Sequence, residues 1–438
     1  MADITPFKGI FYNTAKIGNL SNVVTPPFDV ISEKDRQCYH DRHPQNIVRL
    51  ILGETHRNNW QVHAADFYHT WCLNQILIQD NTPALYLTAL DFSLGTERIT
   101  RYGLIALVGL EPFEKKIIIP HEKTFSKIKS ERLELMKACH SNFSPIFSLF
   151  SDQGSDIIES LRYSVCHHPA DTTFSDDFGH QHRLWRIIDP QLHRFVSEQM
   201  KHKRIFIADG HHRYETALNY REWISQTTSG FSSNHPANWV MMYLTSMEDP
   251  GLIILPAHRI LKGLEYSTHS MFIEKCKVYF DISAIAFNDN NYQKTLAELM
   301  AALRSGSSEN TFGVYKKNDK QFYLLKLKPG IMAEKFGHEL PSALLDLDVV
   351  VLTRLILEEI LEFDQTKLDN ENLIGYLSCE KQAIEAVISG EGDIALLINP
   401  TKIEQVRRVA EEGLIMPRKA TYFYPKVITG MVINDLRG

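Results

Sequence analysis

The chain has 438 residues, of which 44% are hydrophobic and 23% charged, as in an ordinary globular protein. This length exceeds that of a typical single domain and predicts about two or three domains. A chain of this size buries enough apolar surface to need no metal or disulfide support. The formal net charge of −6 argues against a protein that binds nucleic acid non-specifically, so nucleic acid is not an expected partner.

The cysteines are scattered singly, without a CxxC pair, which argues against a zinc ribbon or a disulfide framework. The N-terminus shows no basic segment followed by an apolar one, as a secretory signal would. No apolar run approaches the roughly 20 residues of a membrane-spanning helix. We therefore expect reduced thiols and a cytoplasmic protein that does not span a membrane.

The first region, residues 1–112, is predicted to be mixed α/β. A proline-rich extended stretch at 22–31 precedes a helix capped by Ser32, with Asp35 at the capping-box position. Strands are predicted at 85–92 and 101–110, joined by a turn near Gly95.

Two further regions are predicted, at 113–262 and 263–438. The second region alternates short apolar strands with helices, and the third carries a hairpin, a strongly apolar helix and a terminal strand–helix unit. The predicted strands are 117–119, 144–150, 184–188, 204–208, 239–244, 311–315, 322–327 and 394–398. The predicted helices include 130–140, 190–200, 346–362 and one after residue 399, capped by Asn399 or Thr401.

The strongest local signal is RIFIADGHHRYETALNY, in which the strand at 204–208 runs into DGHHR. Gly210 permits a sharp turn into a helix that begins at about His212 or Arg213. The first N–H groups of such a helix have no partner within it, and they carry partial positive charge. The pattern therefore indicates an anion site of the kind that holds phosphate.

The side chains of this loop suit a phosphate bound with magnesium. His211, His212 and Arg213 add donors, and Arg213 can hold two phosphate oxygens at once. Asp209 lies where a carboxylate can hold Mg²⁺ against the phosphate. The alternative is that Asp209 caps the helix and that the histidines are structural.

A second polar cluster, His121-Glu122-Lys123-Thr124, follows a short strand that ends at Pro120. Glu122 is a candidate general base for a hydroxyl group. Lys123 can hold a phosphate or a substrate carboxylate. The alternative is a turn held by ion pairs.

The segment MPRKATYFYPK, residues 416–426, interleaves basic and aromatic side chains. It can stack on a base and contact phosphate, or form a strand with its aromatic side chains inward and Lys426 at the edge. PPFDV, residues 26–30, is another motif near a strand end and combines two prolines, an aromatic residue and a carboxylate. The chain has no P-loop, nucleophile elbow, HExxH or dinucleotide glycine motif. This argues against a standard NTPase, α/β-hydrolase, zincin or nicotinamide dehydrogenase.

Several motifs, in this order, resemble a widespread bacterial family of unknown function whose hallmark is DGHHRYETAL. They run from Pro6 to about Ile433. The chain departs from the family pattern at Ala420, where serine is expected, and at Phe28, where tyrosine is more common. The motifs are PFKGIFYN…TPPFDVIS, HEKTFSKIKSERLELMKACHSNFSPIF, IADGHHRYETAL, MEDPGLIILPAHR and MPRKATYFYPKVITGMVI.

The central portion is similar to the ParB/sulfiredoxin superfamily, whose members carry a strand–GxxR–helix phosphate loop. Its closest functional branch is the free-serine kinases. The resemblance implies that Glu122 deprotonates the serine hydroxyl and that Asp209 lies at the metal and the nucleotide phosphates. It also implies that His211, His212 and Arg213 line the phosphate loop.

We therefore expect a mixed α/β protein with a ParB/sulfiredoxin-like core between N- and C-terminal α/β regions. The expected function is phosphoryl transfer from ATP or ADP, with Mg²⁺, to a small hydroxyl metabolite, free L-serine first. The alternatives are a nucleotide-binding regulatory or partner-binding protein without turnover, and a phosphate-ester hydrolase. The candidate residues are Glu122, Asp209 and His211 for catalysis, Gly210, His211, His212, Arg213, His121, Lys123 and Thr124 for the nucleotide, and Asp209 and Glu122 for the metal.

Overall fold

The computed structural model describes residues 2–53, 59–122 and 126–437. The chain forms two compact units. Unit 1 comprises residues 1–253 together with 425–438, and unit 2 comprises residues 254–424. The last segment of the chain therefore folds with the first half of the sequence.

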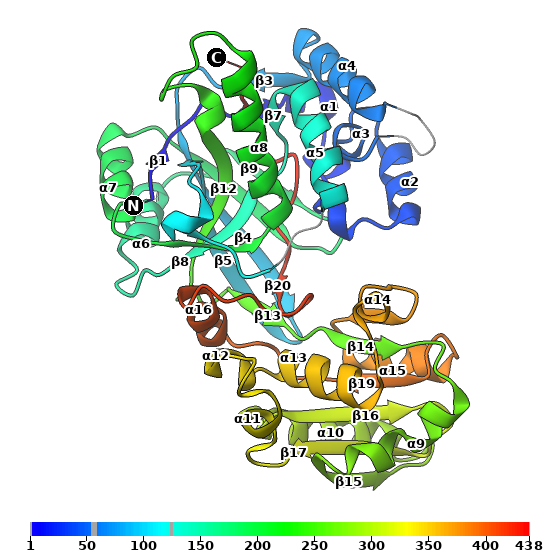
Figure 1. Cartoon of the computed structure of the whole chain (residues 1–438). Helices are drawn as coiled ribbons and strands as arrows, with labels where there is room; N and C mark the ends of the chain where they lie inside the picture. The colour runs from blue at the N-terminus through cyan, green and yellow to red at the C-terminus, as the bar shows by residue number, and fades with distance from the viewer. Residues whose placement is uncertain (1, 54–58, 123–125, 438) are drawn as a thin grey trace. The chain divides into compact units, whose positions relative to one another are not determined.

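A large mixed sheet forms the centre of unit 1 (Figure 1). In the described residues it has nine strands, in the order β6-β11-β8-β12-β5-β4-β10-β9, with β1 beside β5. β6 runs parallel to β11 and β8 runs parallel to β12, whereas the other neighbours are antiparallel. The strands are β1 (Ile4–Thr5), β4 (Leu85–Leu94), β5 (Glu97–Gly109), β6 (Ile118–Ile119), β8 (Ile146–Phe150), β9 (Thr172–Ser175), β10 (Gln181–Ile187), β11 (Ile205–Asp209) and β12 (Trp239–Ser246).

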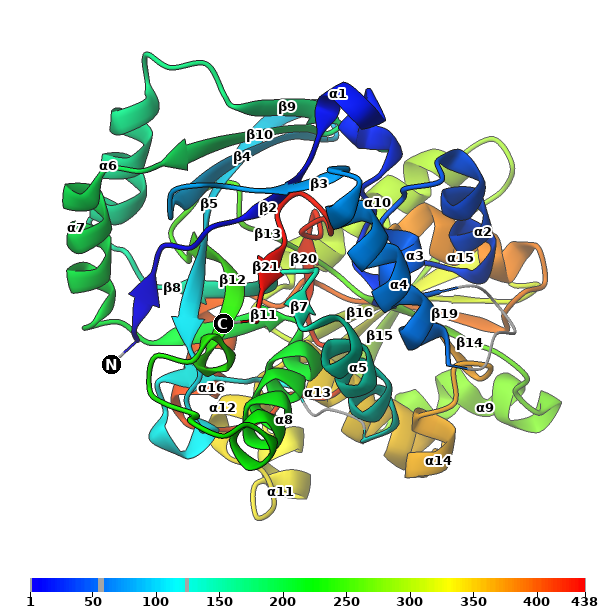
Figure 2. The same cartoon turned by 90° about the horizontal axis from the view of Figure 1, so that it is seen from above.

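Helices and two short strand pairs surround this sheet. In both overall views α6 lies next to α7, and α5 lies next to α8 (Figure 1, Figure 2). The paired strands are β2 (Ile10–Tyr12) with β3 (Leu77–Gln79), and β7 (Ser141–Asn142) with β21 (Asn434–Asp435). The helices are α1 (Thr14–Ile17), η1 (Leu20–Asn22), η2 (Phe28–Val30), α2 (Glu33–Arg42), α3 (Val48–Ile51), α4 (Trp60–Leu73), η3 (Phe113–Lys115), α5 (Ser126–Cys139), α6 (Asp156–Val165), α7 (Pro190–Met200), α8 (His211–Thr227) and η4 (Pro236–Asn238).

Capping residues set where two of these helices begin. The side chain of Asp189 accepts the N–H of Gln191, and Pro190 occupies the first turn of α7, where its missing N–H costs nothing. Ser32 Oγ accepts the N–H of Asp35 at the start of α2. Both helices therefore begin where local side-chain chemistry satisfies the first free N–H groups.

The central strands of unit 1 are buried along their length. All five residues of β8 are buried, as are the first four of β11. Apolar residues of these strands form one core with residues from β4, β5, β12 and helices α6, α7 and α8. Because their faces are covered, these strands can offer only their ends to a ligand.

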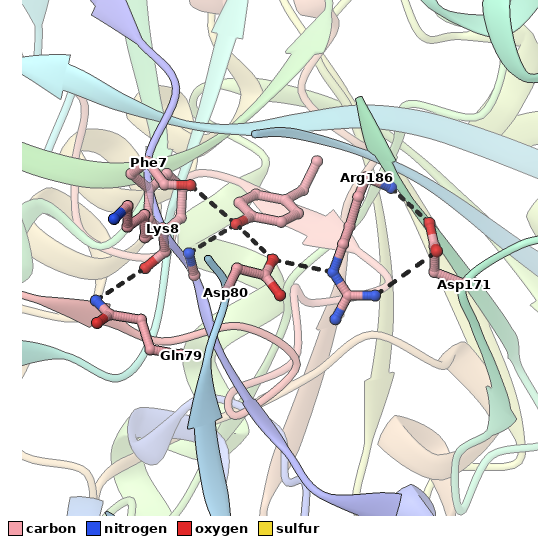
Figure 3. A network of polar contacts seen from close by, with 8 residues as sticks. Phe7, Lys8, Gln79, Asp80, Asp171 and Arg186 are labelled. Atoms are coloured by element: carbon pink, nitrogen blue, oxygen red, sulfur yellow. Dashed lines mark hydrogen bonds and ion pairs between the residues drawn. The ribbon is translucent and has the colours of Figure 1, made fainter. Parts of the chain in front are cut away.

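Polar contacts tie the N-terminal segment to the sheet, as Figure 3 shows. The Tyr86 hydroxyl lies 2.9 Å from the carbonyl oxygen of Phe7 and 3.2 Å from Asp80 Oδ2. Arg186 on β10 donates from Nε to Asp80 at 2.9 Å and from its backbone N–H to Asp171 at 2.7 Å. The first residues of the chain are therefore an integral part of unit 1.

Unit 2 has its own antiparallel sheet, in the order β15-β17-β16-β19-β14-β18 within the described residues. Apolar residues of this sheet pack against α10 and α15. Its strands are β14 (His258–Leu261), β15 (Phe280–Ala286), β16 (Thr311–Lys316), β17 (Gln321–Leu327), β18 (Ile374–Leu377), β19 (Ile394–Leu397) and β20 (Tyr422–Tyr424), and β13 (Ile253–Leu255) begins at the unit boundary. Its helices are α9 (Tyr266–Cys276), α10 (Tyr292–Ser305), α11 (Ile331–Phe336), α12 (Ser342–Leu345), α13 (Asp348–Val350), the π-helix η5 (Val351–Ile360), α14 (Gln365–Leu368), α15 (Glu380–Ile388) and α16 (Ile403–Glu411).

The predicted mixed α/β fold class is confirmed. The two units follow a different division from the predicted regions 1–112, 113–262 and 263–438. β4 and β5 of the first region pair with β10 and β12 of the second, so that one sheet joins both regions. Across the described ranges, no helix combines the length and the apolar character that crossing a membrane requires.

Candidate functional site

The DGHHR sequence forms the turn between β11 and α8. β11 ends at Asp209, and α8 begins at His211, slightly before the predicted start at His212 or Arg213. Gly210 has φ 97° and ψ 29°, in the left-handed region that favours glycine. A Cβ atom at this position would lie 2.8 Å from Nε of Arg213. The backbone conformation therefore favours glycine, and a larger residue would also displace the guanidinium of Arg213.

The first turn of α8 presents backbone N–H groups next to this turn. The first bond of the helix runs from the Tyr214 N–H to the Gly210 carbonyl oxygen, at 3.1 Å. The N–H groups of the three preceding helical residues consequently have no acceptor within the helix. Together with the partial positive charge at a helix start, they suit an anion.

Asp209 holds two cationic side chains at the end of β11. Its Oδ2 accepts a hydrogen bond from Arg213 Nη2 at 2.6 Å, and its Oδ1 accepts one from Lys426 Nζ at 2.8 Å. All three side chains are mostly buried, with 12–15% of their surface exposed. Burial acts to raise the pKa of Asp209, but Lys426 and Arg213 outweigh it and hold the pKa well below its usual range. The carboxylate is therefore ionised, and two cations share one anion.

A second carboxylate, Asp29 in η2, lies near this cluster. Its side chain is exposed, yet crowding by surrounding protein raises its pKa. The Asp209 carboxylate raises that pKa further, whereas Arg213 and Lys426 lower it. Arg213 Nη1 also donates to the carbonyl oxygen of Pro145, which fixes the guanidinium in place.

His121 and His211 form a buried pair beside Asp209. They are 0% and 5% exposed, and their ring centroids lie 4.9 Å apart in an edge-on arrangement. The backbone N–H of His121 donates to Nε2 of His211 at 3.3 Å, so the proton of a neutral His211 lies on Nδ1. Burial lowers the pKa of His121 to about 4 and places that of His211 well below its usual value. His211, a predicted catalytic residue, thus has the surroundings of a residue that positions the neighbouring turn.

The turn that carries Glu122 leaves the sheet at the same edge as the DGHHR loop. β6 and β11 run parallel, with Ile118 opposite Ile205. Parallel strands end at a common edge, so Glu122, which is half-buried, and Gly210 both follow strand ends there. That Glu122 acts as a base stays a prediction.

The structure brings together most of the residues that the sequence analysis singled out for the site. His212 is half-buried at the start of α8. Lys123 and Thr124 lie outside the described residues. At this edge His121 contacts His211, and Arg213 contacts Asp209 across the turn at Gly210.

Two charged residues of this site were not assigned to it from the sequence. Lys426 belongs to MPRKATYFYPK and Asp29 to PPFDV, both of which were noted as dense motifs. Lys426 and Asp209 are separated by 217 positions in the sequence. Neither motif contains a local pattern that would indicate so distant a partner. The one signal was the group of basic residues in MPRKATYFYPK.

A magnesium ion fits this site if it is shared with phosphate. The described part of the chain holds no group of three or more His, Cys, Asp or Glu side chains that could hold a metal ion by itself. Asp209 and Asp29 offer the carboxylate oxygens that Mg²⁺ prefers, and Mg²⁺ commonly takes only one or two of these together with substrate phosphates. Because both oxygens of Asp209 pair with cations, the ion would replace at least one of those pairs.

Acid should destabilise unit 1 through His121. The folded-state pKa is about 4 and the unfolded value about 6.5, so the unfolded chain binds a proton first as the pH falls. The contribution of neutral His121 to the free energy of unfolding is complete above about pH 6.5 and is lost between about pH 6.5 and 4. The loss is at most about 3 kcal/mol. Urea unfolding across this pH range should show that His121→Gln loses less unfolding free energy than the wild type. The exposed His202→Gln control should behave like the wild type, and an equal loss in all three proteins would contradict the assignment.

The chain belongs to the family described as "Protein of unknown function (DUF1015)", which matches residues 4–350. The comparison with curated proteins gave no match. Among solved structures, a free serine kinase in complex with AMP aligns at 13% identity and a TM-score of 0.33, over 73% of this chain and 86% of that one. A conserved hypothetical protein from Pyrococcus furiosus aligns at 12% identity and a TM-score of 0.34, over 76% of this chain and 95% of that one. SbnI with C-terminal truncation from Staphylococcus aureus aligns at 8% identity and a TM-score of 0.33, over 74% of this chain and 85% of that one.

Proposed function

We propose that unit 1 transfers a phosphoryl group from ATP or ADP to a small metabolite that carries a hydroxyl group, with free L-serine as the first acceptor to test. One observation carries the proposal. The N-terminus of α8, two mostly buried cations and the strand end that precedes Glu122 converge at one sheet edge. The proposal includes a core of the ParB/sulfiredoxin type and a cytoplasmic location.

The donor phosphates rest on the turn at Gly210 in this proposal. Phosphoryl transfer needs little covalent help from a protein and depends on positioning and on charge neutralisation. The N–H groups at the N-terminus of α8 supply fixed dipoles, and Arg213 and Lys426 supply charge in a mostly buried place. His121, Lys123, Thr124 and His212 are the further residues that we propose for nucleotide binding.

Asp209 sets the charge balance of the site. With no phosphate present it neutralises Arg213 and Lys426 and keeps both in place. When a phosphate arrives, the cations can turn part of their hydrogen bonding to it, which frees carboxylate oxygen for Mg²⁺. A bound Mg²⁺ supplies further neutralisation of the transferring phosphoryl group.

Glu122 is the proposed base. The acceptor oxygen forms a bond to the terminal phosphorus of the donor, and the bond from that phosphorus to the bridging oxygen breaks. The nucleotide leaves with the electron pair of that bond, and the hydroxyl proton passes to the Glu122 carboxylate.

Arg213→Ala should weaken nucleotide binding. It removes a charge-assisted contact worth about 1.5–3 kcal/mol, so the Kd for ADP with Mg²⁺ should rise roughly 10- to 150-fold. Isothermal titration calorimetry measures this change directly. Arg194→Ala, at an exposed arginine of α7 in the same unit, is the matched control and should leave the Kd unchanged. An unchanged Kd for Arg213→Ala would remove this side chain from the site.

The activity itself is tested by incubating the protein with ATP, Mg²⁺ and L-serine and measuring phosphoserine by mass spectrometry. A panel of other hydroxyl metabolites extends the same assay. Release of inorganic phosphate in the absence of an acceptor would instead favour the alternative function of a phosphate-ester hydrolase.

The second candidate, a nucleotide-binding regulatory protein, is favoured by the complete pairing of Asp209 with cations, which leaves no oxygen of this carboxylate unpaired for a metal. Nucleotide binding without turnover of any acceptor would support it.

A further inference from the structure

A polar cavity lies on one face of the large sheet of unit 1, over β4, β5 and β10. Its volume is about 340 Å³. The described lining residues are all polar, and none of them belongs to the cluster at Asp209. They are Asp91 on β4, Arg98 and Thr100 on β5, and Gln181 and Arg183 on β10.

The register of the three strands brings these side chains to one face of the sheet. Asp91 lies opposite Thr100 on β5 and opposite Gln181 on β10. Directly opposite residues point to the same side, with Cβ atoms about 4.5–5.5 Å apart. Arg98 lies two positions from Thr100, and Arg183 lies two positions from Gln181, so both arginines share this face. The side chains therefore meet over a small area of the sheet.

The cavity begins where the helical cover of this face ends. The next residues on the same face, Ala89 of β4 and Trp185 of β10, are buried in the core that includes residues of α6 and α7. Asp91 and Arg183 are half-buried, and Arg98 is exposed. A ligand can therefore reach the polar groups of the cavity.

Two contacts hold Arg183 in position. Its Nη2 donates to both carboxylate oxygens of Asp91 at 2.9 Å, and Thr100 Oγ1 donates to Asp91 Oδ1 at 2.7 Å. The guanidinium also lies 5.5 Å from the centroid of the Trp185 ring. The side chain still exposes 31% of its surface. Because Arg183 is fixed before a ligand arrives, little conformational entropy is lost when it binds one.

Arg98 and Gln181 add hydrogen-bonding groups that no described residue uses. Neither side chain makes a hydrogen bond or an ion pair within the described ranges. Two arginines and one aspartate give the lining a net charge of +1. Asp91 accepts three hydrogen bonds, whereas a carboxylate can accept about four, so it can take one more donor. The cavity thus offers a net positive charge together with donors and acceptors for hydroxyl groups.

We infer that this cavity binds a hydroxyl-rich anionic metabolite, such as a sugar phosphate or a sugar acid. Arg98 and Arg183 hold its anionic group. Gln181 and the remaining acceptor site of Asp91 bind its hydroxyl groups. An apolar ligand would cover these polar groups without giving them partners, which is costly. One water needs about 10–15 Å³ of this kind of volume, so the cavity has room for roughly 20–30 non-hydrogen atoms, enough for a sugar phosphate.

Three small probes separate the recognised groups. Glucose 6-phosphate carries a phosphate and hydroxyl groups, gluconate carries a carboxylate and hydroxyl groups, and glucose lacks the anionic group. Saturation-transfer NMR titrations of the full chain, without nucleotide, measure each affinity. At least one of the two anions should bind saturably, and glucose roughly tenfold or more weakly. Binding of one anion alone supports the site and identifies its anionic group.

Two results with these probes would overturn the inference. One is equal affinity for glucose and for the anions, since the arginines would then contribute nothing. The other is binding of a hexaglutamate peptide without binding of either anion, which would mark the cavity as a contact for an acidic protein segment.

Variants of Arg98 locate the bound anion. Arg98→Gln removes an exposed charge without a partner, so it should fold as well as the wild type and bind the anion roughly tenfold or more weakly. Arg98→Lys keeps the charge but loses the forked geometry, so it should retain part of the affinity. Arg194→Gln, at an exposed arginine of α7, is the control and should bind like the wild type. Unchanged affinity in Arg98→Gln would place the anion elsewhere and overturn the inference.

A second pair of titrations separates this cavity from the phosphate cluster. Arg98→Gln should retain wild-type affinity for ADP with Mg²⁺, and Arg213→Ala should retain wild-type affinity for the anion that binds. Loss of anion binding in folded Arg213→Ala would place the anion at Asp209 and overturn the inference. A wild-type protein that binds the anion at Arg98 but binds no nucleotide would contradict only the proposed function.

Discussion

Glu122→Gln should lower the turnover number roughly 10²–10⁴-fold, the usual contribution of a general base. Glutamine keeps the shape of the side chain and much of its hydrogen bonding, but it cannot accept the proton of the hydroxyl group. The donor phosphates rest on the turn at Gly210, so the Kd for the nucleotide should change little. Steady-state kinetics and calorimetry on the same preparation separate the two quantities.

Two outcomes would remove Glu122 from this role. Full activity in Glu122→Gln would show that no proton passes to it. A parallel loss of turnover and nucleotide affinity would mark it as a metal ligand or a structural residue. Glu114→Gln is a suitable control, because Glu114 is an exposed glutamate of η3 that precedes the same strand.

Asp209→Ala should have the largest effect on stability. It leaves Arg213 and Lys426 mostly buried and without their shared counterion, and breaking such a pair costs about 3–5 kcal/mol of unfolding free energy. Asp177→Ala is the matched control, since its ion pair with Arg42 is 42% and 28% exposed and is worth less than about 1 kcal/mol. Urea unfolding near pH 7 measures both. Equal effects in the two variants would contradict the account of the cluster.

The pH dependence of this effect has a definite sign. The pKa of Asp209 is lower in the folded protein than the unfolded value of about 3.9, so its contribution is present above about pH 4 and is lost as the pH falls further. The difference between the wild type and Asp209→Ala should therefore shrink below about pH 4. Added inorganic phosphate should restore more stability to the variant than to the wild type, because it replaces the missing anion.

The turn from β11 into α8 could be predicted from the sequence because its determinants are local. A short apolar run, a glycine and a helical pattern follow one another within about 15 residues. The same holds for α7, where Asp189 and Pro190 give its start, and for the hairpin of β16 and β17. The ion pair of Asp209 with Lys426 depends on tertiary packing and leaves no periodic signal.

Two predictions in unit 2, a helix cap and a helix type, differ from the structure. The predicted caps Asn399 and Thr401 were wrong, since α16 begins after Lys402. Asn399 donates instead to the carbonyl oxygen of Leu303, and Thr401 donates to that of Ala420. The helix predicted at 346–362 is the short α13 followed by the π-helix η5, which apolar periodicity does not distinguish from a continuous α-helix.

The central claim is that the turn at Gly210 binds the phosphates of a nucleotide. Calorimetric titration of ADP with Mg²⁺ into the wild type, Gly210→Ala and Gly179→Ala tests it most directly. Both glycines have positive φ, but a Cβ at Gly179 meets nothing within 4 Å, whereas one at Gly210 meets Arg213. The account predicts saturable binding by the wild type and by Gly179→Ala, competed by inorganic phosphate, and a loss of binding in folded Gly210→Ala. Absence of ADP binding by the wild type, or equal affinity in all three proteins, would contradict it.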